Sequence, residues 1–275
     1  MTKKQWIPGV IGFILLGMMI LGSVLAPVLT SYEPNAMNMA ETLQPPSLQH
    51  LLGTDLLGRD MFSRILYGGR SSMLLALCAA LLSMLVGMLV GVLAGYFGGL
   101  WDYLLTIITN IFQGLPGVSM MVAIAGIMGP GFKSLMLGLV LTNWTGFSRV
   151  VRTEVMKYRE ENFVEGLKVL GASHLRIICG HILPNMFGNT VILLTTRIGR
   201  SLLSISGISY LGLGIQPPTP DWSVMLSDAR MSFRSAPHLI LAPGICIVIV
   251  MFSIHLIGDF LRDWMDRQNR EAGDF

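Results

Sequence analysis

Two residues of this chain could form the nucleophile and base of a hydrolase. Ser209 and His255 lie in separate, strongly hydrophobic segments, and a serine paired with a histidine is the catalytic unit of intramembrane serine proteases. Such a pair needs hydrogen-bond reach at one membrane depth. If both segments cross a bilayer, Ser209 lies near the outer end of its segment and His255 near the inner end of the next. A protease is therefore the weakest alternative for this chain.

Two arginines, Arg197 and Arg200, stand one helical turn apart inside a hydrophobic segment. Arg197 lies roughly 16 Å along a helix that begins near Met186, at about 1.5 Å per residue. A charge at that depth costs about 2.5 to 3.5 kcal/mol on insertion scales, so the pair has to face water or another protein. Both are predicted to line a pore and to favour anionic groups. The alternative is a structural contact between subunits.

The sequence contains no motif for metal binding or for nucleotide binding. Cys78, Cys179 and Cys246 lie in different segments, with neither C-x-x-C spacing nor a nearby histidine pattern. The phosphate-binding pattern G-x-x-x-x-G-K-[ST] is missing, and the nearest string, at 131–134, lacks the first glycine and the spacing. We therefore expect no catalytic residue, no metal site and no cofactor bound by this chain.

The composition places these residues in a membrane. The 275 residues are 52% hydrophobic and only 13% charged, against about 25% charged in soluble domains. The net charge of +3 is spread along the chain, which excludes a nucleic-acid-binding surface. Since roughly 20 apolar residues span a bilayer as a helix, the charge-free runs predict an all-α protein with six transmembrane helices. Their approximate ranges are 7–29, 71–101, 103–132, 134–150, 186–213 and 239–261.

The basic residues predict the orientation. With both termini inside, the inner segments hold eleven Lys and Arg and the outer segments six. Positively charged loops stay on the cytoplasmic side, so both termini are predicted to be cytoplasmic. The predicted divisions are a first segment and helix (1–30), an outer loop (31–70), a five-helix core (71–263) with an inner loop (149–185) and an outer loop (214–238), and an inner tail (264–275).

Three glycines predict close helix packing. Gly87, Gly91 and Gly95 recur every fourth residue and so lie on one helix face, where small residues let another membrane helix approach.

The inner loop predicts a helix, a sharp turn and a second helix. Phe163, Leu167 and Leu170 share one face, and Gly171 stands where a left-handed helix cap is needed. Ser173 follows as the N-cap of the second helix. A loop that only reconnects two membrane helices can be a few residues long, so this apolar-faced hairpin is predicted to dock into another protein.

The same loop resembles the E-A-A loop of the membrane subunits of bacterial ABC importers. The spacing from Glu165 to Gly171 to Pro184 matches the pattern E-A-A, three residues, G, about nine residues, I-x-L-P. Gly166 and Leu167 replace the two alanines, and His181 replaces the isoleucine of the closing motif.

Other segments resemble the second permease subunit of the dipeptide, oligopeptide and nickel branch of this family. They are the run LGTDLLGRD at 52–60, SYLGLG at 209–214 with PPTPDW at 217–222, and GD at 258–259 with LRD at 261–263. Together with the inner loop they extend over nearly the whole chain.

The resemblance implies a type I ABC importer permease fold and one half of a translocation pore. It implies a homologous second permease subunit, two cytoplasmic ATPase subunits that hold ATP and Mg²⁺, and an extracytoplasmic binding protein. It places the chain in the bacterial inner membrane. It also implies that the inner loop couples to an ATPase subunit through Phe163, Glu165, Leu167, Leu170, Gly171, Ala172 and Ser173.

The outer loop 214–238 has two interpretations. Asp221 is a plausible N-cap and Trp222 an interfacial anchor, so the segment either forms a surface or re-entrant helix or contacts the binding protein. The substrate, whether a peptide or a nickel chelate, stays open. A stand-alone channel or secondary transporter is the alternative to the importer.

Overall fold

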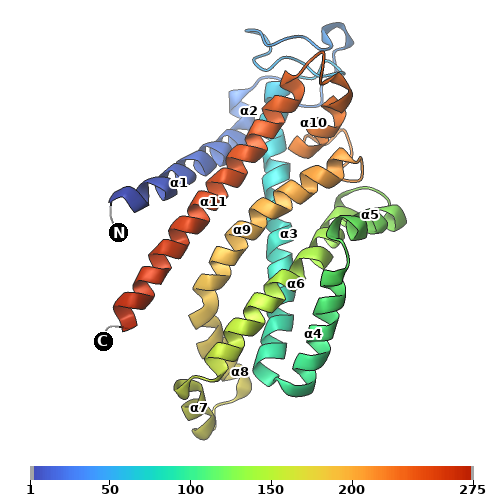
Figure 1. Ribbon diagram of the computed structural model, residues 1–275. Helices are drawn as coiled ribbons and strands as arrows, with labels where there is room; N and C mark the ends of the chain where they lie inside the picture. The colour runs from blue at the N-terminus through green and yellow to red at the C-terminus, as the bar shows by residue number, and fades with distance from the viewer. Residues whose placement is uncertain (1–2, 274–275) are drawn as a thin grey trace.

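In a computed structural model, which describes residues 3–273, the chain is a bundle of long helices with no β-strand among those residues (Figure 1). The main elements are α1 (Lys3–Val24), α3 (Met61–Phe97), α4 (Gly99–Gly114), α5 (Gly117–Met128), α6 (Phe132–Arg159), α9 (Leu183–Tyr210) and α11 (His238–Gly273). Short helices join them: α2 (Ala26–Leu29), η1 (Met39–Glu41), α7 (Asn162–Val169), α8 (His174–Ile177), the π-helical η2 (Ile178–Ile182), α10 (Trp222–Ala229) and η3 (Arg230–Ser232).

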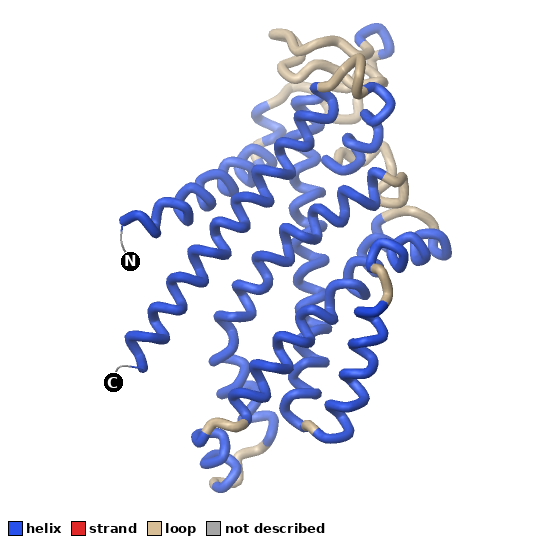
Figure 2. Tube along the Cα trace, in the orientation of Figure 1, coloured by secondary structure: helices blue, strands red, loops and turns tan. Residues whose placement is uncertain are grey.

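The irregular segments gather at the two ends of the bundle (Figure 2). Following the predicted orientation, we call the end with the 31–60 segment the outer end and the end with α7 and α8 the inner end. Helix α1 begins and α11 ends away from the outer end, on the same side of the bundle (Figure 1). The predicted inner tail, 264–275, is the last part of helix α11 as far as Gly273. Residues 274–275 lie outside the described residues.

Length and apolar composition single out four or five helical stretches that could cross a membrane. Four helices or helical stretches are long and apolar enough to cross a membrane, namely 6–24, 61–97, 174–210 and 238–265, and the bent pair α4–α5 raises the number to five. Helix α6 does not meet this criterion although it packs along α3, because it carries polar residues such as Thr142 and Asn143. Six spans therefore stay a prediction.

The predicted third span is broken into two helices. Helices α4 and α5 meet at an angle of 85°. Pro116 lacks an N–H and forces Leu115 into an extended conformation, which ends α4.

Helix α3 begins at Met61, about three turns before the predicted start. The Asp60 carboxylate accepts a hydrogen bond from the Ser63 backbone N–H at 2.7 Å and caps the helix. Arg70, expected in a loop, lies inside α3 and donates from Nε to the Ser23 carbonyl oxygen at 2.6 Å. This bond satisfies a carbonyl at the end of α1, where the first predicted span breaks into α1 and α2.

The predicted glycine stripe is confirmed as the contact between α3 and α6. A side chain on Gly91 would place its Cβ 2.7 Å from the Ser148 carbonyl oxygen, and one on Gly95 would lie 2.8 Å from the Arg152 carbonyl oxygen. An ion pair between Arg152 and Asp102 then ties α6 to α4.

Exchange of Gly91 for isoleucine should push α6 away from α3, because backbone rather than a flexible side chain occupies the space. We expect a stability loss of at least about 1 to 3 kcal/mol, the usual cost of overpacking. Gly17→Ile is the matched control, since Gly17 lies in α1 with no atom near its missing side chain. Thermal melting of the purified protein in detergent distinguishes the two variants, and equal melting temperatures would contradict this packing.

Candidate functional site

The hairpin at the inner end is closed by a Schellman turn. The Gly171 N–H donates to the Lys168 carbonyl oxygen and the Ala172 N–H to the Leu167 carbonyl oxygen, each at 3.0 Å. This pattern needs a left-handed residue after the helix, and Gly171 has a φ of +76°. Ser173 then caps α8 by accepting a hydrogen bond from the Arg176 N–H at 3.4 Å. The predicted helix, turn and helix are confirmed.

A small hydrophobic cluster fixes the hairpin to the bundle. Val164, on α7, is fully buried among Tyr96 of α3 and Val151 and Val155 of α6. Leu167 and Ala172 pack against the same cluster, so the two ends of the Schellman turn share one anchor.

A polar contact supports the same attachment. The Tyr96 hydroxyl and the His174 Nδ1 atom are hydrogen-bonded at 2.9 Å, which joins α3 to the first residue of α8. The chain then passes through the π-helical Ile178–Ile182 into α9, so α8 is continuous with a membrane helix. Movement of the hairpin is thereby linked to both α3 and α9.

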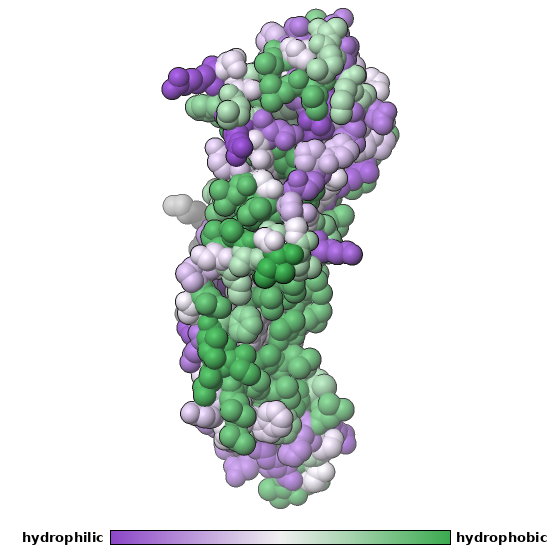
Figure 3. All heavy atoms as spheres, turned by 90° about the vertical axis from the view of Figure 1, so that its right-hand side faces the viewer, coloured by the Kyte–Doolittle hydropathy of each residue, from purple (hydrophilic) through white to green (hydrophobic). Residues whose placement is uncertain are grey.

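The tip of the hairpin is apolar and open. Val169 is 83% exposed, Leu170 84% and Leu175 73%. Figure 3 shows hydrophobic residues at the lower extremity of the molecule, below a more hydrophilic band. Glu165 and Lys168 are also exposed on α7. Because exposed leucine and valine side chains this close together gain free energy when covered, the tip is a surface suited to a partner protein.

The predicted single face of Phe163, Leu167 and Leu170 is divided in the structure. Leu167 is half-buried against the bundle, whereas Phe163 is 41% exposed and Leu170 projects outwards. The predicted apolar face did not include Val164, the anchor, or the tip residues Val169 and Leu175. The spacing of Val164 three residues before Leu167 was the available signal for the anchored face.

The two arginines of α9 have different surroundings. The Arg197 guanidinium lies against Gly146 of α6, with its carbon 5.6 Å from the centre of the Phe147 ring. Arg200 is exposed and has no hydrogen bond or ion pair with any residue that the structure describes. The prediction treated them as a pair, and neither guanidinium has a hydrogen bond or ion pair with any described residue; Arg200 is the more exposed of the two.

Arg200 opens into a groove between α9 and α11 with a volume of about 400 Å³. Thr195, Thr196 and His255 line the groove together with apolar residues of α11. The groove therefore combines a guanidinium with hydroxyl and imidazole groups inside the apolar part of the bundle.

The outer-loop candidates are not at the surface. Asp221 is the N-cap of α10, as predicted, and its carboxylate also accepts a hydrogen bond from the Ser72 hydroxyl at 2.7 Å. Trp222 is 1% exposed and donates from its indole N–H to the Ile65 carbonyl oxygen at 2.9 Å. Both residues hold α10 against α3. In this structure neither side chain is accessible to a binding protein or to the membrane interface.

The hairpin and both arginines lie in a region that matches a known protein family. The family described as binding-protein-dependent transport system inner membrane component matches residues 87–271, which include the hairpin and both arginines. The chain belongs to this family. Residues 8–46 of the permease also match the N-terminal TM domain of oligopeptide transport permease C.

Individual relatives cover most of the permease. The dipeptide transport system permease protein DppC of Alkalihalophilus pseudofirmus is 37% identical over 257 residues, which are 94% of this chain and 84% of the relative. The glutathione transport system permease protein GsiD of Salmonella typhimurium is 39% identical over 256 residues, with coverages of 93% and 84%.

A solved structure shares the fold. A chain of the MetNI methionine ABC transporter, in an inward-facing conformation, superposes with a TM-score of 0.59 at 16% identity, covering 73% of this chain and 95% of that one. The permease thus has the all-α fold of a type I ABC importer permease, as predicted. Its apolar helices and its family make it a multi-pass protein of the bacterial inner membrane. Figure 3 agrees, because hydrophobic residues cover the middle of the face shown.

The family match and the structure argue against the alternative functions, a channel or secondary transporter and a serine protease. Membership of the family replaces a stand-alone channel or secondary transporter. For a protease, the buried Ser209 hydroxyl would need to meet His255, yet it has no hydrogen-bond partner among the described residues. Ser209 lies at the outer end of α9, whereas His255 lies about 26 Å along α11 from its outer end, at 1.5 Å per residue.

Proposed function

We propose that this permease forms one half of the translocation pore of an ATP-driven importer of small peptides, together with a homologous second permease subunit. The names of the two relatives support the substrate class, since one refers to dipeptides and the other to glutathione, itself a tripeptide. Neither name refers to nickel, so the metal chelate is not carried into the proposal. An extracytoplasmic binding protein delivers the peptide.

The observation that carries the proposal is the open apolar tip of a hairpin that is anchored to the bundle by Val164. Val169, Leu170 and Leu175 supply the surface that enters a groove of an ATPase subunit. Glu165 and Phe163 border that surface, while Leu167, Gly171, Ala172 and Ser173 hold its shape. Each of two ATPase subunits takes one permease hairpin and binds the ATP and Mg²⁺, and this chain holds no cofactor of its own.

The pore proposal rests on Arg200. A charged side chain without a partner at mid-helix has to face water or a partner subunit rather than lipid. Its groove accommodates the carboxylate of a passing peptide, with Thr196 and His255 beside it. Arg197 has a positioning role between α6 and α9.

Uptake into vesicles tests the proposal. The complete transporter contains both permeases, the ATPase subunits and the binding protein. It should take up a labelled dipeptide only when ATP is present inside the vesicles, on the side of the membrane that carries the ATPase subunits. Uptake without ATP would contradict an importer of this class. Uptake of a nickel–histidine chelate but of no peptide would overturn the substrate class while leaving the permease role in place.

A further inference from the structure

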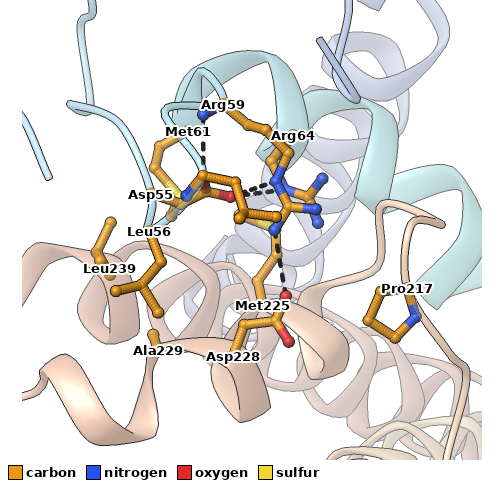
Figure 4. Close-up of a pocket in the computed structure, with 11 residues that line it drawn as sticks. Asp55, Leu56, Arg59, Met61, Arg64, Pro217, Met225, Asp228, Ala229 and Leu239 are labelled. Atoms are coloured by element: carbon orange, nitrogen blue, oxygen red, sulfur yellow. Dashed lines mark hydrogen bonds and ion pairs between the residues drawn. The ribbon is translucent and has the colours of Figure 1, made fainter. Parts of the chain in front are cut away.

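A cavity at the outer end contains four charged residues that the transport proposal does not use. It has a volume of about 240 Å³ and lies between the loop before α3, the start of α3, α10 and the start of α11 (Figure 4). Asp55, Arg59, Arg64 and Asp228 are its charged residues, and its other walls are apolar, with Met61, Met225 and Leu239 among them.

One of the two carboxylates, that of Asp55, is held by its own loop and by Arg59. An oxygen of Asp55 accepts from the backbone N–H groups of Leu57 at 2.9 Å and Arg59 at 3.0 Å, and its other oxygen accepts from the Arg59 Nε at 2.6 Å. Asp55 therefore shapes the loop and holds Arg59 in place.

Arg64 is buried without enough partners. Its side chain is 1% exposed, and one terminal nitrogen donates to the Pro34 carbonyl oxygen at 3.1 Å and to the Asn35 Oδ1 atom at 3.3 Å. Its Nε and its other terminal nitrogen have no hydrogen-bond partner among the described residues, and Nε is 3.7 Å from the Asp55 carboxylate. A buried guanidinium with two nitrogens that lack a hydrogen bond favours a further acceptor beside the Asp55 carboxylate.

Asp228 is the weakly held member of the cluster. Its carboxylate is one-third exposed and, among the described residues, pairs only with Arg59, at 3.3 Å. Burial raises the pKa of Asp228 above its usual value, although Arg59 and Arg64 oppose the rise. Rotation of the Asp228 side chain alone would free the Arg59 Nη2 atom toward the cavity.

We propose that Arg59 and Arg64 form a receptor for a carboxylate that enters this cavity from the outer side, and that Asp228 is the internal carboxylate it displaces. A bound carboxylate would accept from the unsatisfied nitrogens of Arg64, and the apolar walls would hold the group attached to it. The ligand class is a carboxylate on a small apolar body. It comes either from the C-terminus of a peptide or from an acidic side chain of the binding protein.

Binding of N-acetyl-leucine to the complete transporter in lipid nanodiscs, without binding protein, tests the site directly. Calorimetry should show binding of the acid at least about tenfold tighter than of N-acetyl-leucinamide, because charged hydrogen bonds are lost with the amide. Asp228→Asn should tighten binding of the acid several-fold by removing the internal competitor. Asp263→Asn, an exposed carboxylate on α11 outside the cavity, is the control and should bind as the wild type does.

Arg64→Gln should weaken binding of the acid at least about tenfold, as expected for a lost charged hydrogen bond. If this variant fails to assemble, Arg64→Lys, which keeps the charge but loses the planar fork, takes its place. Equal binding of acid and amide, or no gain in Asp228→Asn, would overturn the site. No binding of either probe would mean that water satisfies Arg64, and would overturn it as well.

The source of the carboxylate follows from two further measurements on Arg64→Gln. Weaker binding of the binding protein, whether loaded or empty, would assign an acidic side chain of that protein. Weaker uptake of a dipeptide but not of its C-terminal amide would assign the peptide. The peptide source rests on the proposed function, whereas the binding of N-acetyl-leucine does not, so failure of one is distinguishable from failure of the other.

Discussion

Exchange of Gly171 for valine is expected to uncouple ATP hydrolysis from uptake while the permease stays in the membrane. Gly171 has a φ of +76°, which a β-branched residue adopts only at a cost of about 1 to 3 kcal/mol. No atom lies within 4 Å of the missing side chain, so the strain is in the backbone and not in packing. Relief of that strain rotates α7 against α8 and moves the apolar tip. An energy of this size predicts a loss of substrate-stimulated ATPase activity of at least about fivefold.

Gly166→Val is the matched control for this result. Gly166 lies in the same hairpin and also has open space around its Cα, but it lies within α7 without a positive φ. Valine is tolerated at such an exposed helical position. Uptake and ATPase activity in reconstituted vesicles should therefore match the wild type. If Gly171→Val behaved as Gly166→Val does, the hairpin would not transmit the ATPase cycle.

The second expected result separates the two arginines of α9. Arg200→Gln should lower peptide uptake by at least about tenfold, because a charged hydrogen bond to the substrate carboxylate contributes about 1.5 to 3 kcal/mol. Assembly of the transporter should be unaffected, since Arg200 has no partner among the described residues. The loss should be smaller for a dipeptide amide than for the free dipeptide.

Arg197→Gln is expected to act on assembly instead. It removes the contact of a guanidinium with Gly146 and the Phe147 ring between α6 and α9. We expect a lower yield of assembled transporter, measured by gel filtration, with near-normal uptake per assembled complex. Failure of Arg200→Gln to assemble would instead make that residue a contact between subunits, the alternative to a pore-lining role.

Several features of this permease follow from local sequence alone. The left-handed turn at Gly171, the cap at Ser173 and the cap at Asp221 depend on residues within a few positions of each other, and all three were predicted correctly. The glycine stripe also follows from one helix, because its period needs no knowledge of the partner helix. Local chemistry and periodicity are sufficient wherever the neighbours in space are neighbours in sequence.

Which side chains of each helix are buried and which are exposed depends on the tertiary structure. Val164 is an anchor and Leu170 a tip residue because α3 and α6 cover one side of α7, which the helical period cannot reveal. Trp222 is buried because its indole N–H donates to Ile65 and its backbone N–H to Ser72, about 150 positions earlier in the chain. Arg197 and Arg200 look alike in sequence, yet α6 meets only the first. The cluster of Asp55, Arg59, Arg64 and Asp228 likewise exists only because α10 folds back onto the start of α3, and long-range packing of that kind leaves no local pattern.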